Sequence, residues 1–225
     1  MLHADRTRPA LVQGGCAPWF PSPQAGVERR LLERTGGEVA LASSIVRYQP
    51  GCRFPAHRHD LGEEFLVLEG TFSDERGDYP TGTYVRNAPG SRHAPFSASG
   101  CVIFVKLRQM APEETASLRV FPEDREWVAE HETGVQRARL FVAGAMTVHL
   151  DRLAPGVRWD SPESPGGEEL FVVQGSLHLI EPESSVLEAW GWSRRPTSHR
   201  VGHAGPDGAL VWVKRGHLLF PRPAG

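Results

Sequence analysis

Short runs of apolar and β-branched residues recur along the chain, separated by turns that contain glycine or proline. Residues 38–48 (EVALASSIVRY), 65–68 (FLVL) and 101–107 (CVIFVKL) are runs of this kind. The polar residues 74–77 have the composition of a hairpin tip. Short strands joined by regularly spaced turns are typical of a β-sandwich or a β-barrel. The first half therefore predicts an all-β fold with about seven short strands.

The second half repeats the pattern of the first. Residues 26–33, 50–54, 62–70 and 100–106 have counterparts at residues 134–141, 155–159, 167–175 and 208–214. The offset between counterparts stays at about 105 to 108 residues, which indicates an internal duplication. We therefore predict two tandem domains of one fold, residues 1–113 and residues 114–225, which meet near the polar segment 111–116 (APEETA).

Composition narrows the class of function. The 225 residues carry a formal net charge of −2, so we expect neither a nucleic-acid partner nor a membrane partner. The 24 glycines and 19 prolines are dispersed, as many turns require. The three cysteines show no ligand spacing, which fits a reducing compartment and buried thiols. The first fifteen residues carry little pattern and no apolar segment, so we expect a loose lead-in or an arm across a partner there. We also expect a cytoplasmic protein.

The stretch from Pro50 to Gly70 holds the densest candidate chemistry. His57 and His59 are separated by one residue, so on an extended segment both imidazoles lie on the same face. Glu63 has the same parity and can point the same way across a short turn at residues 60–62. Imidazole and carboxylate groups that face one point can bind a metal ion. A fourth ligand would have to come from a distant strand.

These residues, together with residues 89–93 (PGSRH), resemble the two sequence motifs of the cupin superfamily. The resemblance implies a small double-stranded β-helix, or jelly-roll barrel, in each half of the chain. It also implies that His57, His59, Glu63 and His93 bind one metal ion inside the first barrel. The fold expected from this resemblance is a pair of tandem cupin barrels, a bicupin.

The sequence of residues 57–95 resembles one branch in particular, the cupin domain of ChrR-type proteins, which are named for an anti-sigma factor. The likeness extends over about residues 19–110 and reaches the second half only in outline. An acetylacetone-cleaving dioxygenase is a related cupin. The anti-sigma activity of ChrR belongs to a separate zinc-binding helical domain. We do not expect that activity here, because no cluster of histidine and cysteine precedes residue 19.

The donor set limits the metal without choosing it. Three neutral imidazoles and one carboxylate suit Zn²⁺ or Fe²⁺ best, and Mn²⁺ and Ni²⁺ are compatible. We expect one such ion per chain, in the first domain. Four protein ligands could close a tetrahedral site, which favours a structural or sensing metal. They could also leave positions open on a six-coordinate ion, which favours catalysis.

The second repeat has lost two of the four ligand types. Aligned on the first repeat, its positions hold Pro162, Ser164, Glu168 and His199 in order. We therefore predict a degenerate barrel without a metal ion, kept as a packing partner. Glu168 and His199 are expected to pair with each other, with the pKa of each shifted toward the ionised pair. Alternatively, these two residues line a ligand pocket with Trp159 and Ser164.

The remaining candidates carry weaker signals. We expect Glu64 to face away from the metal, and Lys106 and Lys214 to have a structural role at the ends of matching strands. Tyr84 and Arg86 are candidates for lining the metal cavity. Six histidines without ligand spacing are expected to be solvated: His3, His131, His149, His178, His203 and His217.

Two functions follow from these predictions. The first is a metal-binding bicupin of ChrR-like type that acts as a sensor or small-ligand binding module. The alternative is a metal-dependent dioxygenase, with iron, that acts on a β-diketone-like small molecule. A purely structural protein would require the metal to be absent. The resemblance to cupins also implies a homodimer.

Overall fold

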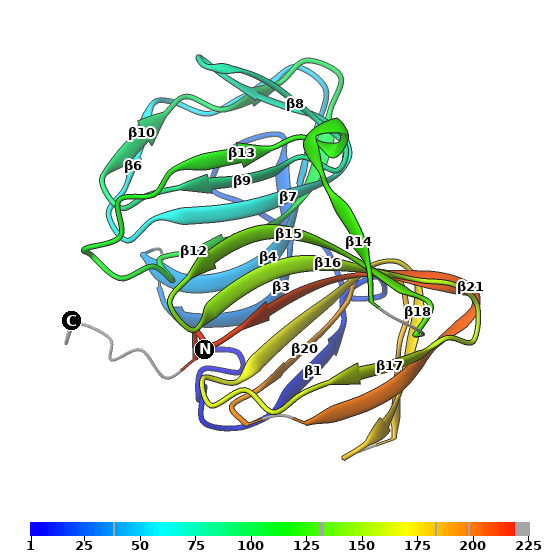
Figure 1. Cartoon of the computed structure of the whole chain (residues 1–225). Helices are drawn as coiled ribbons and strands as arrows, with labels where there is room; N and C mark the ends of the chain where they lie inside the picture. Colours follow the sequence, from blue (N-terminus) through cyan, green and yellow to red (C-terminus); the bar gives the residue numbers. More distant parts are fainter. Residues whose placement is uncertain (38, 131–132, 183, 198, 219–225) are drawn as a thin grey trace. The chain divides into compact units, whose positions relative to one another are not determined.

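The computed structural model describes residues 1–218 except residues 38, 131, 132, 183 and 198. The chain forms two compact units (Figure 1). The first consists of Met1–Ala4 and Ala17–Asp124, and the second of Asp5–Cys16 and Arg125–Gly225. The boundary of the internal repeat at residues 113 and 114 stays a prediction. No helix among the described residues has the length and apolar character that a membrane span requires.

Antiparallel strands build the described part of the first unit. Its larger sheet contains β2 (Phe20–Pro21), β3 (Val27–Gly36), β4 (Ala40–Tyr48), β5 (Cys52–Arg53), β7 (Glu63–Asp74), β8 (Gly77–Pro80), β9 (Tyr84–Asn87), β11 (Phe96–Ser97), β12 (Cys101–Leu107) and β13 (Leu118–Val120). A second sheet pairs β6 (His57–His59) with β10 (Ser91–His93). A 3₁₀ turn, η1 (Pro122–Asp124), follows β13. The predicted strand at residues 101–107 is confirmed as β12, and the predicted hairpin tip is the turn between β7 and β8.

The described part of the second unit is one antiparallel sheet. It contains β1 (Ala10–Gln13), β14 (Trp127–Ala129), β15 (Val135–Ala143), β16 (Met146–Leu153), β17 (Arg158–Ser161), β18 (Glu168–Glu181), β19 (Ser185–Leu187), β20 (Gly191–Arg195) and β21 (Arg200–Arg215). The prediction of an all-β fold is therefore confirmed.

The two larger sheets repeat one strand order. The first runs β13-β9-β7-β12-β4-β3-β2 and the second β1-β20-β18-β21-β16-β15-β14. Registers match as well, because Glu63 lies opposite Leu107 and Glu168 lies opposite Arg215. The edge strands differ in origin: β13 follows the first repeat along the chain, whereas β1 precedes it. The expectation of a loose N-terminal lead-in is wrong, since β1 pairs with β20 from Ala10↔Arg194 to Gln13↔Gly191.

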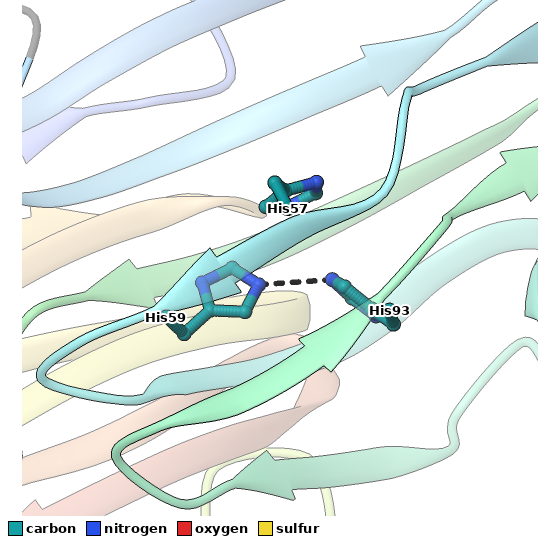
Figure 2. Close-up of side chains that lie close together, drawn as sticks. All are labelled: His57, His59 and His93. Carbon is teal, nitrogen blue, oxygen red and sulfur yellow. Dashed lines mark hydrogen bonds between the residues drawn. The ribbon is translucent and has the colours of Figure 1, made fainter.

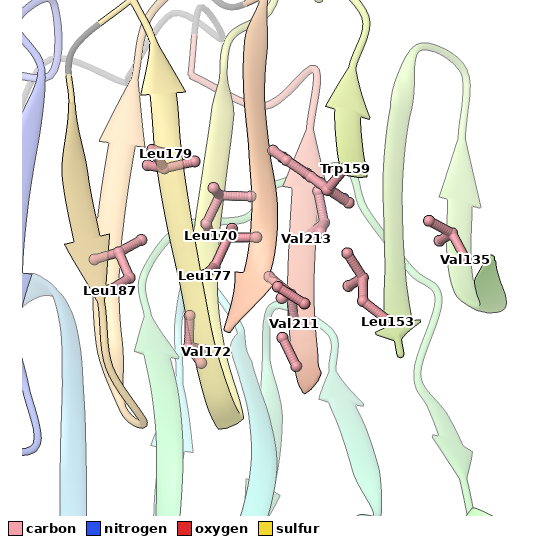
Figure 3. Packing of buried hydrophobic residues seen from close by; sticks show 12 residues of the cluster. Val135, Leu153, Trp159, Leu170, Val172, Leu177, Leu179, Leu187, Val211 and Val213 are labelled. Carbon is pink, nitrogen blue, oxygen red and sulfur yellow. The ribbon is translucent and has the colours of Figure 1, made fainter. Parts of the chain in front are cut away.

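Alternation along the strands fills each barrel with apolar side chains, because successive residues of a strand face opposite sides. In the first unit, Phe65, Val67, Ile103 and Val105 are buried together with Phe72. The second unit has a matching cluster (Figure 3), in which Leu170 and Val172 of β18 meet Val211 and Val213 of β21 around Trp159. Burial of such side chains stabilises a fold by about 1.5–3 kcal/mol each relative to exposure.

The three cysteines occupy different environments and are all free thiols. Cys52 and Cys101 are buried in the first unit, as expected, but Cys16 is exposed, which corrects the expectation of buried thiols. Burial raises the pKa of Cys52, and burial raises the pKa of Cys101 to about 11. The thiolate is the reactive form of cysteine. Both buried thiols are therefore unreactive for two reasons: reagents do not reach them, and little of either thiol is deprotonated.

We expect Ellman's reagent at pH 8 to label one thiol per chain rapidly, that of Cys16. Only about one thousandth of Cys101 would be thiolate at that pH, so the other two thiols should react after denaturation. The measurement is the absorbance time course, and Cys16→Ser should remove the rapid phase. A rapid phase of two or three equivalents in the folded protein would contradict this prediction.

Candidate metal centre

Three histidines from two paired strands converge in the first unit (Figure 2). Strand β6 carries His57 and His59, and β10 carries His93; the two strands pair with His57 opposite His93. One ring nitrogen of each histidine lies within 4.8 Å of the others. The Nε2 atoms of His59 and His93 are 2.9 Å apart, at hydrogen-bonding distance. The His-x-His spacing thus places two imidazoles on one face, as the sequence predicts.

A turn after His59 brings a carboxylate to the same point. Gly62 has a φ of +72°, a backbone conformation that favours glycine, and a Cβ there would also displace Met110 Sδ, which would lie 2.3 Å from it. The chain then enters β7, whose first residue is Glu63. Glu63 Oε2 lies 3.5 Å from Nε2 of His59 and 3.5 Å from Nε2 of His93. The carboxylate therefore faces the histidine cluster.

Hydrogen bonds from the surrounding chain orient these side chains. His57 Nδ1 lies 3.0 Å from the carbonyl oxygen of Pro55, which directs its Nε2 away from the backbone. His93 Nδ1 lies 3.3 Å from Asp74 Oδ2. The Asn87 amide donates to Glu63 Oε2 at 3.0 Å. Such outer contacts fix the tautomer and ring orientation of histidines that bind metals.

Burial and neighbouring charges shift the pKa values of this cluster. Burial lowers the pKa of His59. Burial raises the pKa of Glu63, but the imidazoles of His59 and His93 outweigh it and hold that pKa below its usual value. Burial also lowers the pKa of His93, yet the hydrogen bond with Asp74 and the charge of Glu63 outweigh it and raise that pKa. Glu63 is thus held in the ionised form that metal binding requires, whereas the raised pKa of His93 means that a metal ion must compete with a proton at that imidazole.

The donor set fits a divalent first-row metal ion. Imidazole nitrogen and carboxylate oxygen are ligands that Zn²⁺ and Fe²⁺ accept, and the three ring nitrogens already lie close together. His57, His59 and His93 form a candidate metal site, and Glu63 lies at its side. Binding by all four residues stays a prediction, and the donor set does not identify the metal.

A cavity of about 360 Å³ adjoins the histidines. His57, His59 and Glu63 form part of its wall, and apolar side chains such as Val46 and Ile103 form another part. The volume corresponds to about a dozen water molecules, so the cavity is suited to a small molecule rather than a peptide. The candidate metal site therefore opens onto a space where a ligand could reach it.

Asp74 is a site residue that the sequence analysis assigned only to a hairpin tip. The register of β7 against β12 shifts at Leu68, because Val67 pairs with Ile103 and Glu69 pairs with Val102. This bulge inverts the alternation, so Phe72 and Asp74 face the interior, whereas before the bulge the odd-numbered residues do. Asp74 also accepts hydrogen bonds from Tyr79 Oη at 2.9 Å and from the Arg76 amide at 2.8 Å.

We expect Asp74→Asn to weaken metal binding by about 10–100-fold, because the amide lacks the charge that polarises and orients His93. The measurement is a titration of metal-free protein with Zn²⁺ in the presence of a competing chelator. Asp78→Asn is the matched control, since Asp78 lies on the same hairpin and accepts a hydrogen bond from Ser73. Equal affinity in Asp74→Asn and wild type would show that Asp74 does not position His93.

Side chains of the opposite parity face away from the histidines. Glu64 is buried, and it accepts a hydrogen bond from Tyr84 Oη at 2.6 Å and lies 3.6 Å from Arg86 Nη1. Glu64 thus faces away, as predicted, but Tyr84 and Arg86 accompany it, so the prediction that they line the metal cavity is wrong. Lys106, also buried, donates to Ser43 Oγ at 2.9 Å, which agrees with a structural role.

The second barrel holds an ion cluster at the corresponding position. Glu168 is fully buried, and Arg215 Nε donates to its Oε2 at 2.8 Å. Arg200 Nε lies 3.3 Å from the other carboxylate oxygen, and Ser161 also donates to Glu168. Two guanidinium groups therefore neutralise the carboxylate that corresponds to Glu63.

The predicted pair of Glu168 with His199 is wrong. His199 is exposed, and its Nε2 lies 3.1 Å from Asp160 Oδ1. Arg200, and not His199, lies against Glu168 in the way that His93 lies against Glu63. The alternative of a pocket shared with Trp159 also fails, because His199 faces solvent.

The histidines without ligand spacing divide into two groups. His3 is exposed, and His178 and His203 are half-buried with ring centroids 4.9 Å apart. His149 and His217 are buried, which corrects the expectation that all six are solvated. His217 Nε2 lies 2.9 Å from Glu169 Oε2, and His149 Nε2 lies 3.6 Å from Asp151 Oδ2. His131 lies outside the described residues.

Comparison with known proteins identifies the first half of the chain. The sequence model of the family described as ChrR Cupin-like domain matches residues 7–111. This segment is a ChrR cupin-like domain. The match covers the cavity-lining strands and all four predicted ligands of the first unit. A search of curated proteins finds no match.

Solved structures share the fold of the ChrR cupin-like domain and of the second unit. A candidate dioxygenase from Nostoc punctiforme has a TM-score of 0.73 at 15% identity, covering 97% of this chain and 88% of that chain. A candidate glyoxylate-induced protein from Pseudomonas aeruginosa has a TM-score of 0.74 at 12% identity, covering 100% and 94%. Lactobacillus farciminis oxalate decarboxylase, in a formate complex, has a TM-score of 0.64 at 12% identity, covering 92% and 86%. These likenesses confirm the tandem cupin, or bicupin, fold.

Proposed function

We propose that the ChrR cupin-like domain binds one divalent metal ion through His57, His59, Glu63 and His93 and presents it to a small molecule. The observation that carries this proposal is that three imidazoles converge on the wall of a cavity. A structural zinc site is closed by protein ligands, whereas a site that acts on a ligand keeps an accessible position. The bound ion would supply a Lewis-acidic position for an oxygen donor.

The residues of the chain have separate tasks in this proposal. The carbonyl of Pro55 and the carboxylate of Asp74 orient His57 and His93, and Asn87 holds one oxygen of Glu63. The apolar wall limits the number of water molecules that accompany a ligand. The proposed role is a small-ligand binding or sensing module. Glu63 lies close enough to His59 and His93 to serve as a fourth protein ligand, so the accessible position requires an ion with more than four coordination sites.

A metal-dependent dioxygenase is the second candidate. The apolar part of the cavity wall favours it, since a water-poor site suits oxygen chemistry on an apolar substrate. The Nostoc punctiforme structure described as a candidate dioxygenase shares the fold. The substrate class considered is a β-diketone or a similar enolisable molecule, with Fe²⁺ as the metal.

Metal analysis of the purified full-length protein tests the proposal. We expect about one equivalent of metal per chain, as four converging ligands imply, and its loss in His57→Ala. Oxygen uptake by Fe²⁺-loaded protein with a panel of β-diketones then separates the two candidates: binding without uptake supports the ligand-binding role, and uptake that His57→Ala abolishes supports the dioxygenase. Protein that retains no metal after loading with Zn²⁺, Fe²⁺, Mn²⁺ or Ni²⁺ would refute both.

A homodimer is proposed from the resemblance to cupins. Light scattering coupled to size-exclusion chromatography measures the molar mass directly.

A further inference from the structure

The cavity beside the histidines carries more positive charge than its own carboxylates balance. The charged residues that line it, besides the histidines, are Arg29, Arg34, Arg58, Arg108, Asp60 and Glu63. Four guanidinium groups thus face two carboxylates. Charged side chains are rarely fully buried without partners, and the partners of each arginine decide whether this excess is available to a ligand.

Both carboxylates are already engaged. Asp60 lies 3.5 Å from Arg58 Nε and 3.6 Å from Arg108 Nη1, so these two arginines share one acid. Glu63 faces His59 and His93. Neither of these two acids remains to neutralise Arg29.

Arg29 is the arginine without a counterion. It is half-buried on β3, and it makes no ion pair or side-chain hydrogen bond with any residue that the structure describes. Arg34, on the same strand, donates to the carbonyl of Gly37. Burial, and then the charge of Arg29, lower the pKa of Arg34, so two like charges act on each other at this wall. An anion between them would relieve that repulsion.

The inner face of β4 adds hydrogen-bond donors. Ser44 and Tyr48 line the cavity, and neither hydroxyl has a hydrogen-bond partner among the described residues. Burial, and then the charge of Glu63, raise the pKa of Tyr48 well above its usual value, so its hydroxyl keeps its proton and can donate. The cavity therefore offers unpaired donors, from Arg29, Ser44 and Tyr48, to a ligand that carries acceptor oxygens.

The sheet also sets the length of the ligand. Arg34 pairs with Ala42, Ala42 with Leu107 and Leu107 with Glu63, so these residues form one row across four strands. Three strand spacings separate the backbones of Arg34 and Glu63 by about 14 Å. Because side chains reach inward from both ends of this row, the remaining span suits a short carbon chain.

We propose that this cavity binds a small organic carboxylate, held through its carboxylate by Arg29 and Arg34 and through a second oxygen near Tyr48 and the histidines. The apolar body of the ligand packs on Val46 and Ile103. This inference rests on the proposed function, since the second oxygen is the one presented to the metal. It makes the preferred ligand anionic, in contrast to a neutral β-diketone.

Isothermal titration of full-length protein, metal-loaded and metal-free, tests the inference. The probes are 4-oxopentanoate and 5-oxohexanoate, each beside its uncharged methyl ester. We expect the acids to bind about 10-fold more tightly than the esters. Arg29→Gln should remove most of that advantage and leave ester binding unchanged, and Arg29→Gln/Arg34→Gln should remove all of it. Arg158→Gln, an exposed arginine that pairs with Asp160, is the control.

Three results would overturn the inference. The esters could bind as tightly as the acids, the acids could bind Arg29→Gln as tightly as wild type, or neither acid could bind. Metal analysis of the same samples keeps the two proposals apart. If the protein holds no metal but the acids still bind through Arg29, the anion site stands and the metal proposal fails. If metal binds normally but the affinity for the acids is the same in Arg29→Gln as in wild type, the metal proposal stands and the anion site fails. Thermal unfolding of each variant verifies that it folds.

Discussion

Replacing Glu168 with alanine is expected to lower the free energy of unfolding of the second unit by about 3–5 kcal/mol. Glu168 and Arg200 are both fully buried, and Arg215 is nearly so. The substitution removes the carboxylate that both guanidinium groups face and leaves their charges in the barrel interior. An uncompensated buried charge costs more than the lost ion pair contributes, because the interior cannot solvate it.

Urea unfolding followed by tryptophan fluorescence measures this effect. Glu163→Ala is the matched control, since Glu163 is exposed on the same segment and should change stability by less than about 0.5 kcal/mol. Replacing both Glu168 and Arg200 with methionine should recover part of the loss, because it removes opposite charges together. A loss below about 1 kcal/mol in Glu168→Ala would mean that the cluster is not the main neutralising contact for these arginines.

Withdrawal of metal should have the second large effect, confined to the first unit. A ligand that binds only the folded state stabilises it by about 2.7 kcal/mol at a free concentration 100 times its Kd, and by about 4.1 kcal/mol at 1,000 times. We therefore expect a chelator to lower the Tm of the wild-type protein and added Zn²⁺ to restore it. His59→Ala should abolish this response, because His59 lies between His93 and Glu63.

Differential scanning calorimetry with and without chelator is the measurement. His203→Ala is a suitable control, since His203 lies on β21 in the second unit, far along the chain from the predicted ligands. His57→Ala supplies a second test in case His59→Ala fails to fold. A wild-type Tm that changes with neither chelator nor added metal would contradict the prediction.

The sequence was sufficient for the parts of the site that depend on local alternation. One intervening residue places His57 and His59 on one face, and the turn at Gly62 returns Glu63 to it. The apolar run at residues 101–107 predicted the first and the last residue of β12 correctly. The internal repeat anticipated the shared strand order of the two sheets. These features depend on spacing, which a sequence displays directly.

Parity fails where a strand carries a bulge. The extra residue at Leu68 reverses the faces of β7, so Asp74 reaches His93 although simple alternation from Glu63 would place it outside. The second misassignment concerns the residue that meets Glu168. Alignment by spacing put His199 at the position of His93, whereas the side chain of the next residue, Arg200, lies against Glu168. Register is set by hydrogen bonding between strands and cannot be counted along one of them.

The charge balance inside the cavity could not be predicted from the sequence, for a different reason. Arg29, Ser44 and Tyr48 come from two strands that precede the histidine motif, and neither strand carries a recognisable pattern of ligands. Their relevance arises only because β3 and β4 continue the sheet that contains Glu63. Residues gathered in this way carry no motif.

The pairing of β1 with β20 has a consequence for synthesis on the ribosome. Ala10 leaves the exit tunnel early, but its partner Arg194 is made 184 residues later. The first unit can therefore complete its sheet while β1 waits without a partner, and closing so long a loop makes this edge a late event in folding. A chain cleaved between the two repeats would leave its second fragment with β20 as an unprotected edge, open to pairing with other chains.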